Sequence, residues 1–155
     1  MKAKYFLLIL LLTSFFELSA KVLVQKDIPY RENSTGVRNL LDVYYPENTE
    51  EAKDVLVFIH GGSWSGGKKD IYWWLGKNMA RKNVVSVIIN YSLSPESQYE
   101  KMASDCAVAI KWVRDSIARY GGRADRIFVM GHSAGGHLAA LINNDPRLFE
   151  SCRAG

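Results

Sequence analysis

The apolar positions of this chain alternate between short continuous runs and longer stretches with helical spacing. Residues 54–60, 84–91 and 127–130 are nearly all apolar, which is the pattern of strands buried on both faces of a parallel sheet. Two earlier segments, 22–30 and 40–45, have weaker strand patterns. We therefore expect five strands, three of them in the interior of a sheet.

Three other stretches have the spacing of amphipathic helices. The first is predicted over 70–82 with Asp70 as its N-cap. The longest, 99–120, ends at Gly121-Gly122, and the third, 134–143, directly follows the fifth strand. The predicted apolar face of the first helix consists of Ile71, Trp74, Leu75 and Met79. This alternation of strands and helices predicts a single α/β domain with right-handed crossovers.

The fifth strand leads without a spacer into Gly131-His132-Ser133-Ala134-Gly135, which fits the pattern Gly-x-Ser-x-Gly. Between a strand and a helix, this pattern is typical of a nucleophile elbow, a sharp turn that exposes the serine hydroxyl. The backbone N–H of Ala134 would then point at a developing oxyanion. The alternative is a plain glycine-rich turn in which Ser133 caps the helix.

A second motif, Phe58-Ile59-His60-Gly61-Gly62-Ser63-Trp64, follows the third strand. With both motifs the chain resembles the α/β-hydrolase superfamily, and in it the His-Gly-Gly-x-Trp esterase branch of hormone-sensitive-lipase-like, feruloyl-esterase-like and kynurenine-formamidase-like enzymes. The resemblance implies a three-layer α/β fold with a mostly parallel sheet whose first strands are antiparallel. It also implies an oxyanion hole formed by the N–H groups of Gly61, Gly62, Ser63 and Ala134.

The resemblance covers about residues 37–145 and stops after the elbow helix, roughly halfway through such a domain. A serine nucleophile needs a general base and an orienting carboxylate, which follow the serine in this superfamily. The only later histidine, His137, lies one helical turn beyond Ser133 and does not match that base. We therefore expect a truncated serine carboxylic-ester hydrolase that lacks the catalytic Asp and His. Amide hydrolysis by the same groups and a non-catalytic binding protein are the alternatives.

Several aromatic residues lie close to these motifs in the sequence. Trp64 ends the second motif, and Tyr91 belongs to Asn90-Tyr91-Ser92-Leu93-Ser94-Pro95-Glu96, which resembles the Asp-Tyr-Arg-Leu-Ala-Pro-Glu segment of the same esterase branch. We expect Trp64 and Tyr91 to line a substrate pocket. Packing of the loop is the alternative role for the aromatic cluster.

The first 20 residues have the features of a secretory signal. Lys2 and Lys4 precede an apolar run that ends near the small residue Ala20. We expect cleavage near Ala20, which divides the chain into a signal peptide, 1–20, and a hydrolase domain, 21–155. The mature protein would be periplasmic or extracellular, without a stable membrane anchor; an uncleaved anchor is the alternative.

Charge and metal-ligand residues exclude several other functions. The formal net charge is +4, but the basic residues are scattered, so we expect no nucleic-acid binding. No Cys/His cluster has zinc spacing, so we expect neither a metal nor a cofactor, and a small-molecule ester as the partner. Cys106 is expected to be a small buried helix residue, with a disulfide to Cys152 as the alternative. The oligomeric state stays open.

Overall fold

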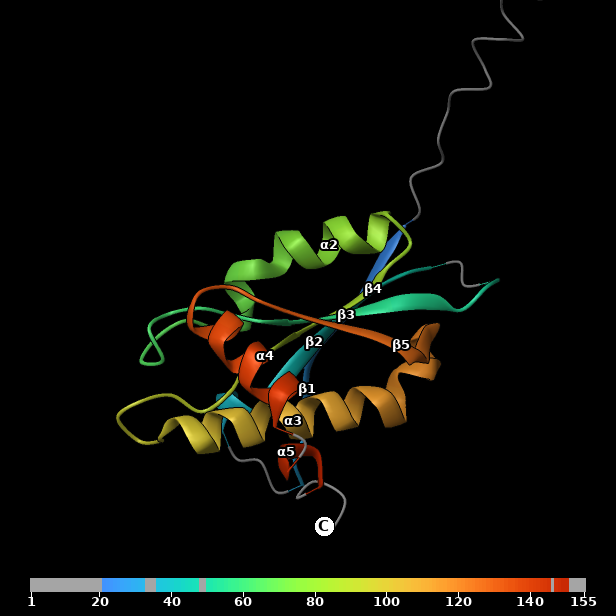
Figure 1. The fold of residues 1–155 in the computed structure, drawn as a ribbon. Coiled ribbons are helices and arrows are strands. Elements are labelled where there is room, and N and C mark those ends of the chain that lie inside the picture. The colour runs from blue at the N-terminus through green and yellow to red at the C-terminus, as the bar shows by residue number, and fades with distance from the viewer. Residues whose placement is uncertain (1–20, 33–35, 48–49, 146, 151–155) are drawn as a thin grey trace, which may run out of the picture.

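A computed structural model gives the arrangement of most of the chain (Figure 1). It describes residues 21–32, 36–47, 50–145 and 147–150. The predicted signal peptide, 1–20, and Cys152 lie outside the described residues. Within the described part, no helix combines the length and apolar character that a membrane crossing requires.

Five strands form a mixed sheet in the spatial order β1-β2-β4-β3-β5. The first two strands, β1 (Val22–Pro29) and β2 (Leu40–Pro46), are antiparallel to their neighbours. The strands β4 (Val85–Ile89), β3 (Lys53–Ile59) and β5 (Gly122–Gly131) are parallel to one another. This confirms the predicted sheet with antiparallel first strands. Because β3 and β5 are adjacent and parallel, the two motifs that follow them lie at the same end of the sheet.

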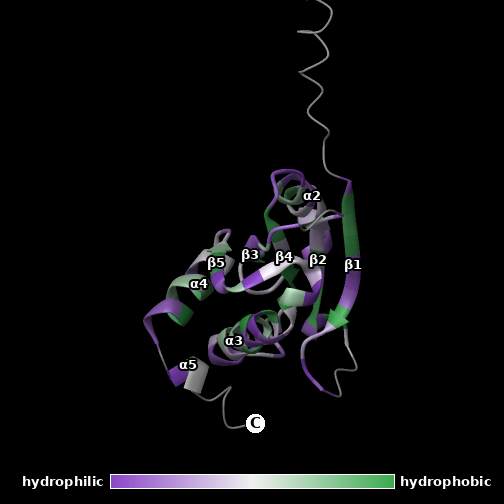
Figure 2. Ribbon diagram, turned by 90° about the vertical axis from the view of Figure 1, so that its right-hand side faces the viewer, coloured by the Kyte–Doolittle hydropathy of each residue, from purple (hydrophilic) through white to green (hydrophobic). Residues whose placement is uncertain are grey.

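Helices cover both faces of the sheet and give three layers. Figure 2 shows α2 (Trp73–Arg81) on one face, with α3 (Tyr99–Ser116) and α4 (Ala134–Asn144) on the other. The short helices are η1 (Val37–Asn39), η2 (Lys69–Tyr72), η3 (Ile117–Tyr120) and α5 (Arg147–Glu150). The main core, under α3 and α4, includes Val57, Val87, Ile89, Cys106, Ile110, Val113, Leu138 and Ile142. The smaller core, under α2, consists of Tyr44, Phe58, Leu75, Ala80 and Ile88.

The helix predicted over 70–82 divides into η2 and α2, which corrects part of the sequence prediction. Asp70 does not cap it, because α2 begins at Trp73 after a 3₁₀ turn and has no side-chain cap. Ile71 and Trp74 are about half exposed, at 54% and 50%, so they do not belong to the buried face that contains Leu75. A 3₁₀ turn has three residues per turn, which shifts the phase of the side chains that enter the α-helix.

The predicted bounds of one helix and one strand differ less from the structure. The helix predicted over 99–120 ends as α3 at Ser116 and continues as η3 to Tyr120. Gly121 follows as its cap, with a φ of 73° in the left-handed region that glycine favours. The strand predicted over 127–130 begins earlier, at Gly122. Cys106 is fully buried on α3, as expected.

Candidate active site

Ser133 lies in the turn between β5 and α4. Its φ of 51° and ψ of −118° fall in a region that residues with a side chain rarely occupy. Its side chain makes no capping hydrogen bond to α4, and the residue is exposed. Both observations favour the nucleophile elbow over the alternative in which Ser133 caps the helix.

Two glycines of the motif let the turn pack this closely. A Cβ at Gly131 would lie 2.2 Å from the carbonyl oxygen of Gly135. A Cβ at Gly135 would lie 2.2 Å from the carbonyl oxygen of Ile59, at the end of β3. Neither position has room for a side chain. His132 adds a hydrogen bond from its backbone N–H to the Ile59 carbonyl oxygen at 3.1 Å, which fastens the elbow to β3.

The loop after β3 lies directly against this elbow. A Cβ at Gly61 would lie 3.3 Å from the Cβ of Ser133 and 2.8 Å from the carbonyl oxygen of His132. Gly62 (φ 134°) and Ser63 (φ 52°) follow in a tight turn with left-handed backbone angles. The structure thus brings Gly61 and Ser133 together.

Ala134, the residue after the serine, also lies where an oxyanion donor is expected. Ala134 is buried and is the first residue of α4. The first N–H groups of a helix lack partners within that helix, so this end attracts negative charge. Gly61 and Ala134 therefore adjoin Ser133 as an oxyanion site requires, and the donor roles of Gly61, Gly62, Ser63 and Ala134 stay a prediction.

His60 supports the loop from inside. Its Nδ1 lies 2.8 Å from the carbonyl oxygen of Gly61, and its ring stacks on Tyr91 with the centroids 4.5 Å apart. Burial lowers the pKa of His60, so the ring is neutral at physiological pH. Its Nε2 has no hydrogen-bond partner among the described residues.

Tyr91 is completely buried, which corrects the expectation that it lines a substrate pocket. Its hydroxyl donates a hydrogen bond to the carbonyl oxygen of His60 at 2.9 Å. Tyr91 is therefore a support for the His60 turn. The sequence alone does not reveal this role, because it depends on the stacking of two residues that are 31 positions apart.

Trp64, in contrast, is 40% exposed and lines a cavity of about 540 Å³ beside the elbow helix. The cavity is lined by Trp64, Ser94, Pro95, Ser97, Gln98, Tyr99, Met102 and His137. The indole of Trp64 meets the ring of His137 edge to face, with the centroids 5.7 Å apart. The carbonyl oxygen of Trp64 accepts a hydrogen bond from the N–H of Ser94 at 2.8 Å, which joins the loop to the segment after β4.

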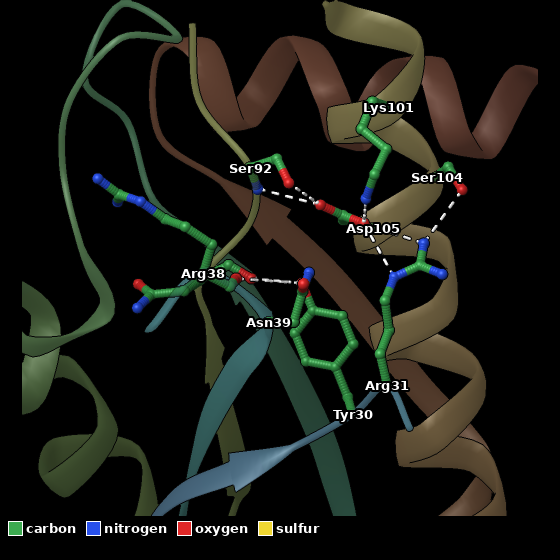
Figure 3. A network of polar contacts seen from close by, with 9 residues as sticks. Tyr30, Arg31, Arg38, Asn39, Ser92, Lys101, Ser104 and Asp105 are labelled. Atoms are coloured by element: carbon green, nitrogen blue, oxygen red, sulfur yellow. Dashed lines mark hydrogen bonds and ion pairs between the residues drawn. The ribbon is translucent and has the colours of Figure 1, made fainter. Parts of the chain in front are cut away.

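A buried carboxylate holds the segment after β4 against α3 (Figure 3). Asp105 accepts hydrogen bonds from the backbone N–H of Ser92 at 3.1 Å and from Nε of Arg31 at 3.0 Å. The hydroxyl of Ser92 and the ammonium of Lys101 also bind it. Burial alone would raise the pKa of Asp105, but the bonds from Lys101 and Ser92 hold it below its ordinary value. The carboxylate is therefore charged at neutral pH.

The side chains of the three histidines of the chain contact groups other than the serine. His132 Nδ1 lies 3.0 Å from the hydroxyl of Tyr72, His137 packs on Trp64, and His60 is buried. The backbone N–H of His137 donates to the carbonyl oxygen of Ser133 at 3.1 Å, but within the part of the chain that the structure describes no hydrogen bond joins the Ser133 hydroxyl to a histidine or carboxylate side chain. Nor do three or more His, Cys, Asp or Glu side chains of that part gather where they could hold a metal ion.

The mixed sheet, the strained serine and the adjoining glycine loop define the α/β-hydrolase class. The BD-FAE family model matches residues 41–152. The chain therefore belongs to the BD-FAE family of α/β-hydrolase esterases.

The sequences of curated esterases are similar to the chain over much of its length. It is 37% identical over 128 residues to a probable isoprenylcysteine alpha-carbonyl methylesterase, ICMEL1, of Arabidopsis thaliana. It is 40% identical over 134 residues to the esterase LipQ of Mycobacterium tuberculosis. These alignments cover 83% and 81% of this chain but only 26% and 31% of the relatives. The chain thus spans about a quarter to a third of the length of these two relatives.

Solved structures have the same fold. Esterase B of Lactobacillus rhamnosis superposes with a TM-score of 0.77 over 99% of this chain and 54% of its own, at 21% identity. A bifunctional GH43-CE protein of Bacteroides eggerthii superposes with a TM-score of 0.69 over 76% of this chain and 17% of its own, at 30% identity. The first of these comparisons establishes the fold alone.

Proposed function

We propose that the protein is a serine carboxylic-ester hydrolase. The observation that carries this proposal is the exposed Ser133, held at φ 51° with Gly61 beside it. The Oγ of Ser133 attacks the ester carbonyl carbon, and the carbonyl π electrons move to its oxygen. The N–H groups of Gly61, Gly62 and Ala134 then hold the oxyanion, with Ser63 next to them. The alcohol leaves, and water hydrolyses the acyl-enzyme.

A general base must accept the proton of Ser133 and return it to the alcohol. The described residues place no histidine in that role, and the chain spans only a part of each esterase that it resembles. We propose that the base and its carboxylate are supplied by residues beyond those in this sequence. The names of the relatives, a methylesterase and an esterase, support an ester rather than an amide as the substrate.

Covalent labelling with a fluorophosphonate probe tests the proposal, since this probe reacts with activated serines. In a longer protein that contains this chain together with the general base, we expect the probe to modify the peptide that contains Ser133, and Ser133→Ala to abolish the modification. Ser104→Ala, on α3, serves as the control and should label like the parent. If neither the folded chain nor a longer protein that contains it is labelled, the hydrolase proposal is contradicted, and a non-catalytic binding role becomes the better interpretation.

We also propose that residues 1–20 direct export and are removed near Ala20. The basic start and the apolar run of this segment support the proposal. Expression with a secretory host followed by N-terminal sequencing of the product checks it. A mature protein that begins at or near Lys21 is expected, whereas an intact N-terminus on a cell-associated product would refute cleavage.

A further inference from the structure

The ammonium group of Lys69 is buried, which is unusual for a lysine. The side chain is 2% exposed, whereas that of the adjacent Lys68 lies on the surface. Lysine is almost never fully buried unless its charge is paired. The position of Lys69, at the start of η2 and directly after the glycine loop, raises the question of what this buried charge does.

Two carboxylates from the first two strands pair with this ammonium. Its Nζ lies 2.6 Å from Oδ1 of Asp27 on β1 and 2.8 Å from Oδ1 of Asp42 on β2. Burial alone would lower the pKa of Lys69, but hydrogen bonds to these two carboxylates raise it above its ordinary value. The group is therefore a cation that links the end of the loop to β1 and β2.

An irregularity in β1 makes this arrangement possible. The register between β1 and β2 shifts between Gln25 and Ile28, and Asp27 lies in the shifted segment with φ 56°. The backbone N–H of Asp27 donates to Oδ1 of Asp42 at 2.9 Å. The bulge thus directs the Asp27 carboxylate toward Lys69.

The backbone of Lys69 is fixed as well. Its N–H donates to Oδ1 of Asn90 at 2.7 Å, and the amide nitrogen of Asn90 donates to the carbonyl oxygen of Val37 at 2.7 Å. The main chain and the side chain of Lys69 are therefore held by different partners, which lie on different strands and turns.

This anchor lies two residues from a point that contacts the oxyanion turn. A Cβ at Gly67 would lie 2.7 Å from Nδ1 of His60 and 2.2 Å from the carbonyl oxygen of Gly61. Arg38 donates to the carbonyl oxygen of Gly67 at 3.2 Å. A displacement of residues 67–69 would therefore move His60 and Gly61.

We propose that Lys69 is a positioning residue, which fixes the loop of residues 60–68 so that the N–H of Gly61 faces the oxyanion formed at Ser133. This inference rests on the proposed function, because the position of Gly61 matters for catalysis only if its N–H holds that oxyanion. Lys69 touches no reacting atom and acts through Gly67 and His60.

The first measurement is independent of activity. Hydrogen–deuterium exchange of the full chain is compared between the parent and the variants Lys69→Met, Lys68→Met and Val113→Ala. In Lys69→Met we expect the amides of residues 60–68 to exchange about ten-fold faster, because their anchor is lost. Lys68→Met should match the parent. Val113→Ala, a core truncation on α3, should lower the melting temperature without selective exposure of the loop.

The second measurement is the rate of fluorophosphonate labelling at Ser133 in a longer protein that contains this chain together with the proposed general base. A misplaced oxyanion donor should lower the maximal labelling rate of Lys69→Met by about 10²-fold and its apparent affinity for the probe much less. Val113→Ala separates this effect from global destabilisation, since it should keep its labelling rate below its melting transition. If Lys69→Met does not fold, Asp27→Asn removes one partner of the ammonium at an exposed position, and a smaller effect of the same sign is expected.

The two proposals fail in different ways. Unchanged exchange of residues 60–68 in Lys69→Met, or in Asp27→Asn if the former does not fold, would overturn the positioning role whatever the labelling shows. Faster exchange with an unchanged labelling rate would overturn it too. If no form of the parent is labelled, the hydrolase proposal fails, and with it the catalytic meaning of the Lys69 anchor, although faster exchange would show that the anchor exists.

Discussion

The backbone of Ser133 is strained, and contacts on both sides of it maintain the strain. Residues in such sparsely populated regions cost about 1–3 kcal/mol each, so the surroundings must supply that free energy. Close packing around the turn offsets this cost, because Gly131 contacts Gly135, and Gly135 contacts the end of β3. The strained backbone of Ser133 therefore depends on glycine at positions 131 and 135, where no side chain would fit.

Adjacent glycines on α4 provide a matched test of this packing. A Cβ at Gly135 would meet the Ile59 carbonyl oxygen at 2.2 Å, whereas one at Gly136 would come no closer than 3.3 Å to the Gly131 carbonyl oxygen. We expect Gly135→Ala to lower the free energy of unfolding by about 2–3 kcal/mol because it overpacks the elbow. Gly136→Ala should change it by less than about 1 kcal/mol, since alanine also favours the helix. Urea denaturation measures both, and equal losses would contradict the packing argument.

The sequence predicted the site only where a residue's role follows from local pattern. Ser133 and Gly61 belong to motifs that specify a turn after a strand, and the structure places them side by side. Tyr91 was misassigned because its burial against His60 is a tertiary contact. The sequence did not reveal the role of Lys69, because Lys68-Lys69 has the pattern of an ordinary charged surface pair. Its burial depends on Asp42 and on the bulge in β1 that brings Asp27 to it.

Among the elements, β5 is bonded to a strand on one side only within the described residues. It pairs with β3, and its other edge has no partner strand there. On that strand Phe128 and Met130 are 53% and 46% exposed. An edge strand with exposed apolar side chains is a template for pairing with another chain. The 155-residue chain should therefore self-associate through β5.

A charge on this strand should weaken the association. Phe128→Lys places a cation on the exposed face and should raise the dissociation constant of the self-association by at least about ten-fold. Val37→Lys makes the same change at an exposed residue of η1, far from β5 along the chain, and serves as the control. Sedimentation velocity over a range of concentrations measures the effect. A parent chain that stays monomeric, or an equal effect of both variants, would refute the role of β5.

The elements themselves were predictable to different degrees. Apolar runs identified β3 and β4, which lie inside the sheet, because burial on both faces favours such runs. The run 127–130 also identified a strand, β5, but the prediction that this strand is interior was wrong: among the described residues β5 is an edge strand, and Phe128 and Met130 are exposed on it. The start of β5 was missed because Gly122 to Arg126 contains charged residues, which here pair along the surface: Arg126 binds Asp54 of β3 at 2.7 Å. The helix over 70–82 was predicted as continuous because apolar spacing does not show where a 3₁₀ turn precedes an α-helix.

At the scale of the whole molecule, Asp105 joins segments that lie far apart in the sequence. It binds Arg31 after β1, Ser92 after β4 and Lys101 on its own helix (Figure 3). Its pKa in the folded chain lies below the ordinary value of 3.8. The unfolded chain therefore binds more protons than the folded one near that pH, and stability rises with pH there.

The acid dependence of unfolding tests this contribution. The stabilisation from Asp105 should be complete above pH 3.8 and disappear as the pH falls through its lower folded pKa. Asp105→Asn should lower the free energy of unfolding by about 2 kcal/mol at neutral pH, because it removes the charged acceptor of the hydrogen bonds from Ser92, Arg31 and Lys101, and it should flatten the dependence on acid. Asp115→Asn, on the exposed part of the same helix, should cost less than about 1 kcal/mol. Urea unfolding at a series of pH values measures the free energy of unfolding of each protein. If this free energy changed equally with pH in the parent and in Asp105→Asn, the argument would be contradicted.

The parallel arrangement of β4, β3 and β5 separates the two ends of the sheet. The elbow and its loop follow the carboxyl ends of β5 and β3, whereas the turn that enters β4, with the exposed Asn83, lies at the amino end. A fluorophore, an epitope or a fused partner attached at Asn83 would therefore stand a full strand length away from Ser133. The carboxyl end of the sheet therefore carries the candidate active site, and the amino end offers an attachment point remote from it.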